Sequence, residues 1–416
     1  MKSMRLWLIL GIFNLILVAS LGTLMRYKIG FDFPFFNQKN LQHAHSHFAF
    51  AGWISHILMV FMMDFIQTYT KKVKIYQQSL ILNMIASYGM LVSFAIQGYA
   101  LFSIIFSSLS LLISFIFCVF FLNDLRKVET LHPSKNYFIA SLVFNIISML
   151  GTAMLIYMMA SKFVPQNLYL SSIYFYLHFQ YNGWFLFAII GLLFLLLKKY
   201  NPELQYSPTI FWLFAGSCIP AYMLSILWIK LPTILYIIVV IASVIQLFAW
   251  SFLWKEIKHY WKNLSTHVHI VFKFVFLLVA FAFTIKVLLQ AFSVIPQISN
   301  LAFGFRSIVV AYLHLVLLAI TSIFLLNYIL IYISNNQPKK IVHIFYMIFV
   351  SGVFATEATL GIQGIASFSY IPIPYVHFIL FGLALLMLLG LIGIFLSLLQ
   401  KKHSNHHLYF IKTLPL

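Results

Sequence analysis

The sequence predicts an all-α polytopic integral membrane protein with about twelve transmembrane helices. Of its 416 residues, 63% are hydrophobic and only 8% are charged, and the mean hydropathy is +0.99. Soluble globular domains carry about 25% charged residues, so this composition excludes a soluble fold. The apolar residues also form twelve separate runs, each near the ~20 residues that cross a bilayer as a helix.

These runs follow one another with short connections along the whole chain. They cover residues 4–25, 44–66, 76–98, 101–123, 137–161, 169–197, 208–229, 231–254, 268–294, 305–333, 341–364 and 374–399. No connection can hold a soluble domain, so residues 1–416 are expected to form a single transmembrane domain. The first run is long enough to span and is interpreted as a retained helix, not a signal peptide. No internal repeat is apparent.

The distribution of Lys and Arg predicts the orientation. If the N-terminus is cytoplasmic, 18 of the 26 basic residues fall in cytoplasmic segments and six in outer segments. This excess follows the positive-inside rule, so both termini are predicted to lie in the cytoplasm of a bacterial-type inner (plasma) membrane. Because the basic residues sit in short loops between apolar runs, the expected partner is the lipid bilayer and not a nucleic acid.

Histidines gather in the outer half of the even-numbered helices, all of which run from outside to inside. They are His45 and His47 in the second run, His178 in the sixth, His314 in the tenth and His377 in the twelfth. Ionisable residues inside a membrane are functional-site hypotheses by default. The structural alternative is that each histidine only hydrogen-bonds a neighbouring helix, the headgroups or water.

Other polar residues lie at similar depths. Tyr181 shares a helix face with His178. Together with His377 and Glu357 they are expected to form a second polar site for a haem, a copper ion or a small substrate. Lys286 and Glu357 have opposite charges at comparable depth, so they could pair with each other or simply join helices.

Imidazole is a good ligand for haem iron and for copper. Two histidines on different helices can hold a haem in the gap between them. The two cysteines, Cys118 and Cys218, fall in different apolar runs, which excludes a cysteine-ligated zinc or iron–sulfur site and makes a disulfide framework unlikely. The pattern therefore favours histidine-based redox chemistry.

Twelve helices, cytoplasmic termini and outer-half histidines on helices 2, 6 and 10 resemble subunit I of the haem–copper oxidases, which include nitric oxide reductases. The opening His-Ala-His and the following Gly-Trp are also similar to the NnrS-type haem- and copper-containing membrane proteins. The resemblance implies an electron-transport oxidoreductase with a low-spin haem b. The haem would lie between His47, or alternatively His45, and His314, and an electron-donor subunit or cytochrome would supply electrons.

The chain departs from this family at the oxygen-reducing centre. Tyr312 occupies the position of the high-spin haem ligand, and the seventh run has no histidine to join His178 at copper. The resemblance thus implies an incomplete active centre, with copper at His178 or His377 left as a second candidate cofactor. The alternative function is a transporter or a haem- or metal-handling carrier with a histidine-lined path. Pro220 favours a broken helix of that kind, whereas the lack of a repeat argues against it.

Overall fold

The computed structural model describes residues 2–204 and 207–400. Within these ranges the chain forms helices and loops and no strand, and twelve helices are long and apolar enough to cross a membrane. The predicted all-α, polytopic fold class is confirmed. The basic tail that includes Lys401 and Lys402 lies outside the described residues.

Eight of the twelve spans are regular α-helices, one of which ends in a 3-10 turn. They are α1 (Lys2–Gly30), α4 (Val73–Gln97), α5 (Leu101–Asp124, continued by the 3-10 turn η2, Leu125–Lys127), α6 (Lys135–Ser161), α10 (Thr233–His267), α11 (Ile270–Phe292), α15 (Lys340–Phe368) and α16 (Val376–Leu399).

The other four spans change helix type on the way through. The second is α2 (Gln38–Phe48), η1 (Ala49–Ser55) and α3 (His56–Ile66), the sixth is α7 (Gln166–His178), η3 (Phe179–Phe185) and α8 (Leu186–Tyr200), and the tenth is α13 (Arg306–His314), η5 (Leu315–Ser322) and α14 (Ile323–Ser334). The segments η1, η3 and η5 are π-helical. The seventh span is α9 (Pro208–Cys218) followed by the 3-10 segment η4 (Pro220–Ile226).

Some helices begin before the apolar run that predicts them, because their first turns consist of polar residues with a side-chain cap. The second span begins at Gln38, where Asn37 accepts hydrogen bonds from the backbone N–H groups of Lys39 (2.8 Å) and Asn40 (3.3 Å). A side-chain cap of this kind satisfies donors that the first helical turn leaves free. The short α12 (Pro296–Gly304) was not predicted, and it lies between the ninth and tenth spans.

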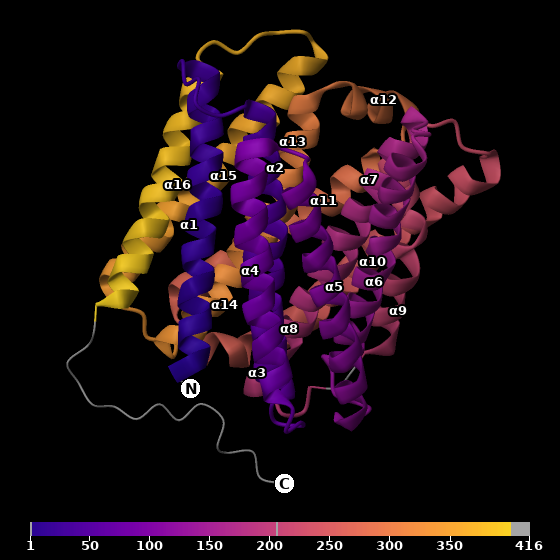
Figure 1. The fold of residues 1–416 in the computed structure, drawn as a ribbon. Coiled ribbons are helices and arrows are strands. Elements are labelled where there is room, and N and C mark those ends of the chain that lie inside the picture. The colour runs from indigo at the N-terminus through magenta and orange to yellow at the C-terminus, as the bar shows by residue number, and fades with distance from the viewer. Residues whose placement is uncertain (1, 205–206, 401–416) are drawn as a thin grey trace.

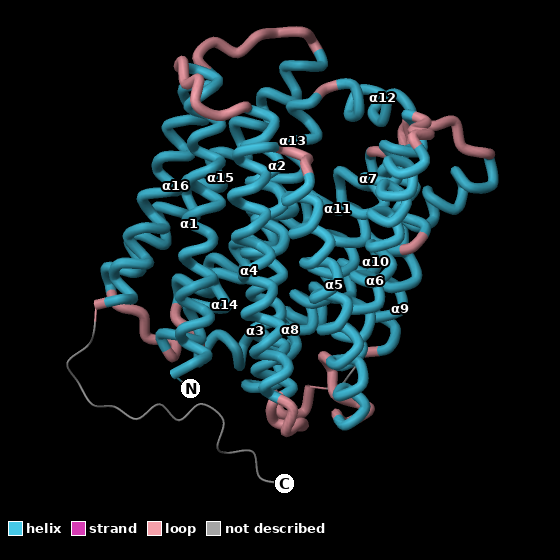
Figure 2. The backbone as a smooth tube through the Cα atoms, viewed as in Figure 1, coloured by secondary structure: helices cyan, strands magenta, loops and turns pink. Residues whose placement is uncertain are grey.

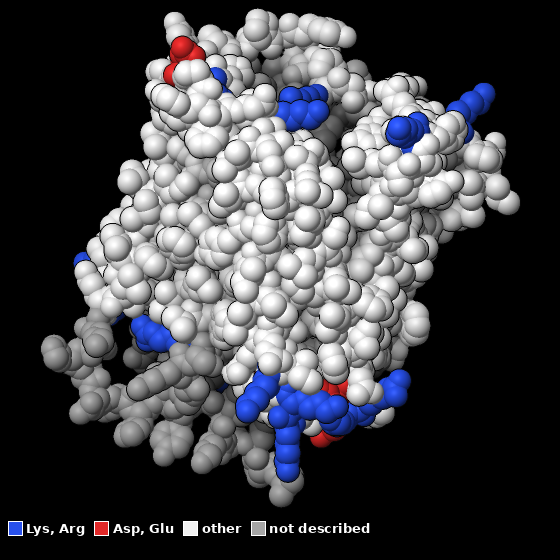
Figure 3. All heavy atoms as spheres, in the orientation of Figure 1, with Lys and Arg blue, Asp and Glu red and all other residues white. Residues whose placement is uncertain are grey.

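The bundle has two ends, which we name by the chain (Figure 1). The terminal end holds the N-terminus and the end of α16, and the distal end holds α12 and the loop between α15 and α16. Loops gather at these two ends (Figure 2). The centre of the face shown in Figure 3 is uncharged, and Lys and Arg side chains gather toward the ends. This distribution suits a protein surrounded by a lipid bilayer.

A short sequence motif occurs at two of the π-helices. The pattern His-Phe-x-x-x-Gly-Trp occurs at residues 47–53 and again at 178–184. In both, the π-helix begins directly after the His or His-Phe; the third π-helix begins directly after His314. The three spans that contain π-helices are the second, sixth and tenth, four apart in the chain.

The repeated tryptophans join these spans. Trp53 Nε1 donates to Ser322 Oγ (2.9 Å), and Trp184 Nε1 donates to Ser55 Oγ (3.2 Å). Each indole therefore reaches the final residue of the π-helix on a neighbouring span. Gly183 is required beside its tryptophan because a Cβ there would lie 2.5 Å from the Cβ of Phe144.

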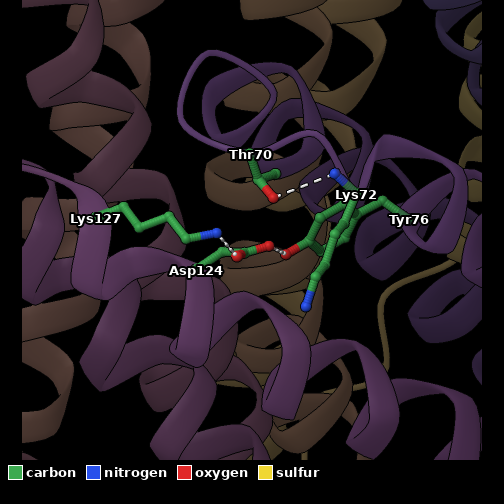
Figure 4. Close-up of polar contacts among 5 residues, drawn as sticks. All are labelled: Thr70, Lys72, Tyr76, Asp124 and Lys127. Atoms are coloured by element: carbon green, nitrogen blue, oxygen red, sulfur yellow. Dashed lines mark hydrogen bonds and ion pairs between the residues drawn. The ribbon is translucent and has the colours of Figure 1, made fainter.

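At the terminal end, a polar cluster ties α4 to α5 (Figure 4). The carboxylate of Asp124 accepts hydrogen bonds from Tyr76 Oη (2.7 Å) and Lys127 Nζ (2.6 Å), and Thr70 accepts from the backbone N–H of Lys72 (3.2 Å). The Asp124 side chain is 2% exposed, so it needs these partners. This cluster joins α4 to α5 at the terminal end of the bundle.

Candidate functional site

The candidate site lies in the distal half of the second and tenth spans, just before their π-helices. π-helical turns are rare and frequently occur at functional sites. The wide turn leaves some backbone carbonyls without their regular helical partners. Here side chains satisfy several of them. Asn14 donates to the Gly52 carbonyl (2.6 Å), and Asn83 donates to the Ala51 carbonyl (3.0 Å). The distortion is thus built into the packing of neighbouring helices.

His45 and His314 each retain a ring nitrogen that makes no hydrogen bond with the described residues. His45 donates through Nδ1 to the Val18 carbonyl of α1 (3.0 Å), which leaves the lone pair on Nε2. His314 Nδ1 is buried with no hydrogen-bond partner among the described residues. The two rings are close enough to interact electrostatically, and Arg26 acts on both of them.

The helix that carries His314 is not closely packed. None of the residues of α13, which ends at His314, is buried, although the span lies in a twelve-helix bundle. Gly22 of α1 faces His45, whose Cε1 would lie 3.4 Å from a Cβ at that position. A Cβ added at Gly361 of α15 would meet nothing within 4 Å. The side chains of α13 are therefore less closely surrounded than those of η5 and α14, the parts of the same span that follow it.

His47 points to a different neighbour. Its ring stacks on Phe94 with 4.3 Å between centroids, and its Nε2 lies 2.9 Å from Tyr99 Oη. The Tyr99 side chain is 54% exposed, as expected for a tyrosine near a membrane surface. Alternate histidines on one helix face nearly opposite directions, so α2 presents His45 to α1 and His47 to α4.

His178 is fully buried, and both of its ring nitrogens are occupied. Nε2 donates to the Cys218 carbonyl (2.9 Å), and Nδ1 accepts from Asn182 Nδ2 (3.2 Å). Tyr181, three residues further on, lies 6.3 Å from the ring of Tyr312 and so connects the sixth and tenth spans. Among the described residues, no three His, Cys, Asp or Glu side chains are grouped as a metal site requires.

The expected second polar site is not assembled from its four predicted members. His377 is exposed near the start of α16, and α16 and α7 lie on opposite sides of the bundle (Figure 1). The expected Lys286–Glu357 ion pair is also absent, because among the described residues Lys127 and Asp124 form the one salt bridge. Lys286 instead lines a small cavity beside the sixth span.

Glu357 belongs with the tenth span instead. Gly364 of α15 packs against Ile308 of α13, and Leu360 lies in the same apolar cluster that α13 contacts. Because the two helices are antiparallel, Glu357, one further turn along this face, is level with His314. Its Oε1 is buried with no hydrogen-bond partner among the described residues.

Sequence reasoning missed Arg26 and Gly22 as site residues. Both lie on the first span, whose sequence shows a basic residue near a helix end and a small residue, features common to many membrane helices. Only the packing of α1 against α2 shows that these two residues lie beside His45. The repeated His-Phe-x-x-x-Gly-Trp pattern was a readable signal for the π-helices. A scan against models of protein families finds no match, and no curated protein matches the chain.

Proposed function

We propose that the chain is a membrane-embedded, haem-binding redox protein with one low-spin haem b between His45 and His314. The observation that carries the proposal is this pair of imidazoles on different spans, each with a ring nitrogen that no described residue uses. A bis-histidine haem supplies one-electron transfer, at a potential set by its surroundings. An electron-donor subunit or cytochrome would complete the path.

The hydrogen bond to Val18 favours His45 over His47 as the span-2 ligand. A haem-ligating histidine commonly donates its other N–H to a carbonyl or carboxylate, which fixes the tautomer and the ring orientation. His45 makes such a bond, whereas His47 Nε2 is paired with Tyr99. His47, the ligand expected from the resemblance, is the second choice.

Arg26 is suited to the haem carboxylates. Arg26 lies one helical turn after Gly22 on α1, on the distal side. It acts electrostatically on both histidines. No described residue forms a hydrogen bond with its guanidinium group. Arginine binds carboxylates with paired, charge-assisted hydrogen bonds. A negatively charged carboxylate at this point would also compensate an otherwise unpaired charge in the membrane.

We further propose that the protein does not reduce oxygen as a proton pump. Copper held by histidine needs several ligands. The nitrogens of His178 are both hydrogen-bonded, and the seventh span brings the Cys218 carbonyl to it in place of a histidine. By the resemblance to the haem–copper oxidases, Tyr312 occupies the position of the second haem ligand. Tyrosine can ligate haem iron, as in catalase. A second haem at Tyr312 is therefore a separate outcome of the test below.

The alternative is a transporter or a haem- or metal-handling carrier. The observation that favours it is the break of the seventh span, where α9 gives way to η4 at Pro220. Discontinuous helices of this kind form substrate sites in transporters. A carrier would bind haem or metal reversibly, so the purified protein would hold it in less than stoichiometric amounts.

The test is a reduced-minus-oxidised absorption spectrum with metal analysis on the purified protein. We expect one low-spin haem per chain, lost in His45→Ala and in His314→Ala and retained in His47→Ala. The absence of haem from the unmodified protein would reject the proposal. Loss in His47→Ala with retention in His45→Ala would reject only the choice of ligand. Stoichiometric copper with cyanide-sensitive oxygen uptake would reject the proposal that the protein does not reduce oxygen.

A further inference from the structure

A polar cavity, separate from the sites discussed above, lies deep in the bundle, where the sixth, seventh, eighth and ninth spans meet. A cavity of about 10 Å³ is lined there by three polar side chains: Asn182 of η3, Gln246 of α10 and Lys286 of α11. Their exposed fractions are 3%, 6% and 3%. The other lining residues are apolar side chains and Cys218. Three polar groups around one enclosed space are costly in a membrane unless something satisfies them.

Two of these groups are oxygens that lack partners. Asn182 Oδ1 and Gln246 Oε1 are buried and make no hydrogen bond with any described residue. The orientation of the Asn182 amide follows from its neighbour. Because His178 donates through Nε2 to the Cys218 carbonyl, its Nδ1 must accept, and only the NH₂ group of Asn182 can donate to it. The amide oxygen is therefore left as an unpaired acceptor.

The third group is a donor without an acceptor. Lys286 Nζ forms no hydrogen bond or ion pair with the described residues, and its recorded contact is with the ring of Phe283, 5.2 Å from the centroid. The cavity thus presents two acceptors and one donor that do not reach one another directly.

We propose that this cavity binds one ordered water molecule. The water would donate its two hydrogens to Asn182 Oδ1 and Gln246 Oε1 and accept a hydrogen bond from Lys286 Nζ. A cavity needs about 10–15 Å³ and two to four polar partners to hold a water, and this one meets both requirements. An anion would face two amide oxygens, and a metal cation would face an ammonium group, so neither matches the set.

The bound water would give Lys286 a polar partner inside the membrane and join three spans through one molecule. It would also extend the hydrogen-bonded chain that begins at His178 and passes through Asn182. This proposal is independent of haem binding, since none of its residues belongs to the His45–His314 pair.

The direct test is a structure of the full chain in lipid nanodiscs at a resolution that shows ordered waters. We expect a peak about 2.7–3.2 Å from all three polar atoms. An empty cavity, or Lys286 Nζ bonded directly to an amide oxygen, would overturn the proposal. A second data set with bromide replacing chloride tests for an anion. A peak that becomes much stronger in bromide would also overturn it.

A double-mutant cycle tests the same proposal through thermal unfolding, without a structure that shows ordered waters. Gln246→Leu and Lys286→Met should each lower the midpoint of thermal unfolding, and the double variant should lower it by clearly less than the two shifts combined, because both act on one water. Ser251→Ala is the matched control on α10, since that exposed hydroxyl bonds only its own helix. Additive shifts contradict the proposal. If Lys286→Met does not fold, Lys286→Gln replaces it.

Discussion

At the scale of single residues, the direction of one hydrogen bond separates otherwise similar histidines. His45 and His47 have the same chemistry and lie two positions apart on one helix. One is anchored to a backbone carbonyl of α1, and the other is paired with a tyrosine at the distal end. Anchoring one ring nitrogen prepares the other to act as a ligand, because it selects the tautomer and limits rotation of the ring.

Glu357 is expected to tune the proposed haem through His314. A carboxylate near the Nδ1–H of an axial histidine makes the imidazole more electron-rich and stabilises the ferric state. At a pH at which the Glu357 carboxyl is ionised, Glu357→Gln should therefore raise the midpoint potential by about 60 mV, the equivalent of about 1.4 kcal/mol for one electron. A spectroelectrochemical titration measures this shift.

Glu129→Gln is the control for that titration. It removes the same charge from an exposed loop residue between the fourth and fifth spans. We expect it to leave the potential unchanged. An equal shift in both variants, or none in Glu357→Gln, would show that Glu357 does not act on His314.

His132, in the loop between the fourth and fifth spans, should make the protein sensitive to acid. Burial lowers its pKa to about 4, below the ~6.5 of an unfolded chain. Between these values the unfolded chain binds a proton that the folded protein does not. The stability is therefore complete above about pH 6.5 and is lost as the pH falls toward 4.

His132→Gln should reduce the loss of stability between pH 7.5 and 5 by about 1 kcal/mol, allowing for the partial exposure of the ring. Thermal unfolding at the two pH values measures this difference. His259→Gln, which removes an exposed imidazole from α10, is the matched control. Identical pH profiles for His132→Gln and the unmodified protein would refute the prediction.

At the scale of elements, three spans carry a π-helix beside a histidine, and two of them, the second and the tenth, carry the candidate site. Each inserts a wide turn directly after a histidine or one residue later, and the freed carbonyls are satisfied by side chains. In η5, Thr321 Oγ1 donates to the Val316 carbonyl (2.8 Å) and Ser322 Oγ to the Leu317 carbonyl (2.7 Å). Hydroxyls five residues after the carbonyl thus stabilise the wider turn locally.

The bond between Trp53 and Ser322 should couple the second and tenth spans. Trp53→Phe and Ser322→Ala each remove the same hydrogen bond, so their effects on unfolding should not be additive. Hydrogen bonds between membrane helices average about 0.6 kcal/mol, and we expect a coupling energy of about that size. Unfolding in a detergent titration of both single variants and the double variant measures it.

The control cycle pairs Ser322→Ala with Trp250→Phe. Trp250 donates to Thr284 and has no bond to Ser322, so those two changes should be additive. Additivity in the Trp53 cycle as well would mean that the indole bond does not link the spans.

At the scale of the whole molecule, the chain enters and leaves the bundle at one end. The N-terminus and the end of α16 both lie at the terminal end (Figure 1). With the excess of Lys and Arg in segments of that end, we predict that it faces the cytoplasm. Reporter fusions after Lys74 and after Lys340 should both report cytoplasm. An external signal from either fusion would contradict the predicted orientation.

The sequence by itself determined the spans, the grouping of their ends and the position of each histidine along its span. These follow from local requirements: hydrocarbon demands about 20 apolar residues in each helix, and position along a helix converts directly into depth. The motif that occurs at two π-helices was also present in the sequence, although it was short enough to be overlooked among so many aromatic residues.

Only the tertiary structure decided which polar groups meet. Lys286 and Glu357 lie at comparable depths, yet one lines a cavity beside the sixth span and the other lies on α15, the helix that packs against α13 of the tenth span. His45 and His47 differ by the rotation of one helix. Depth is a property of a single helix, whereas contact depends on the rotation and lateral position of two. Those are set by packing between residues far apart in the chain, such as Gly22 against His45.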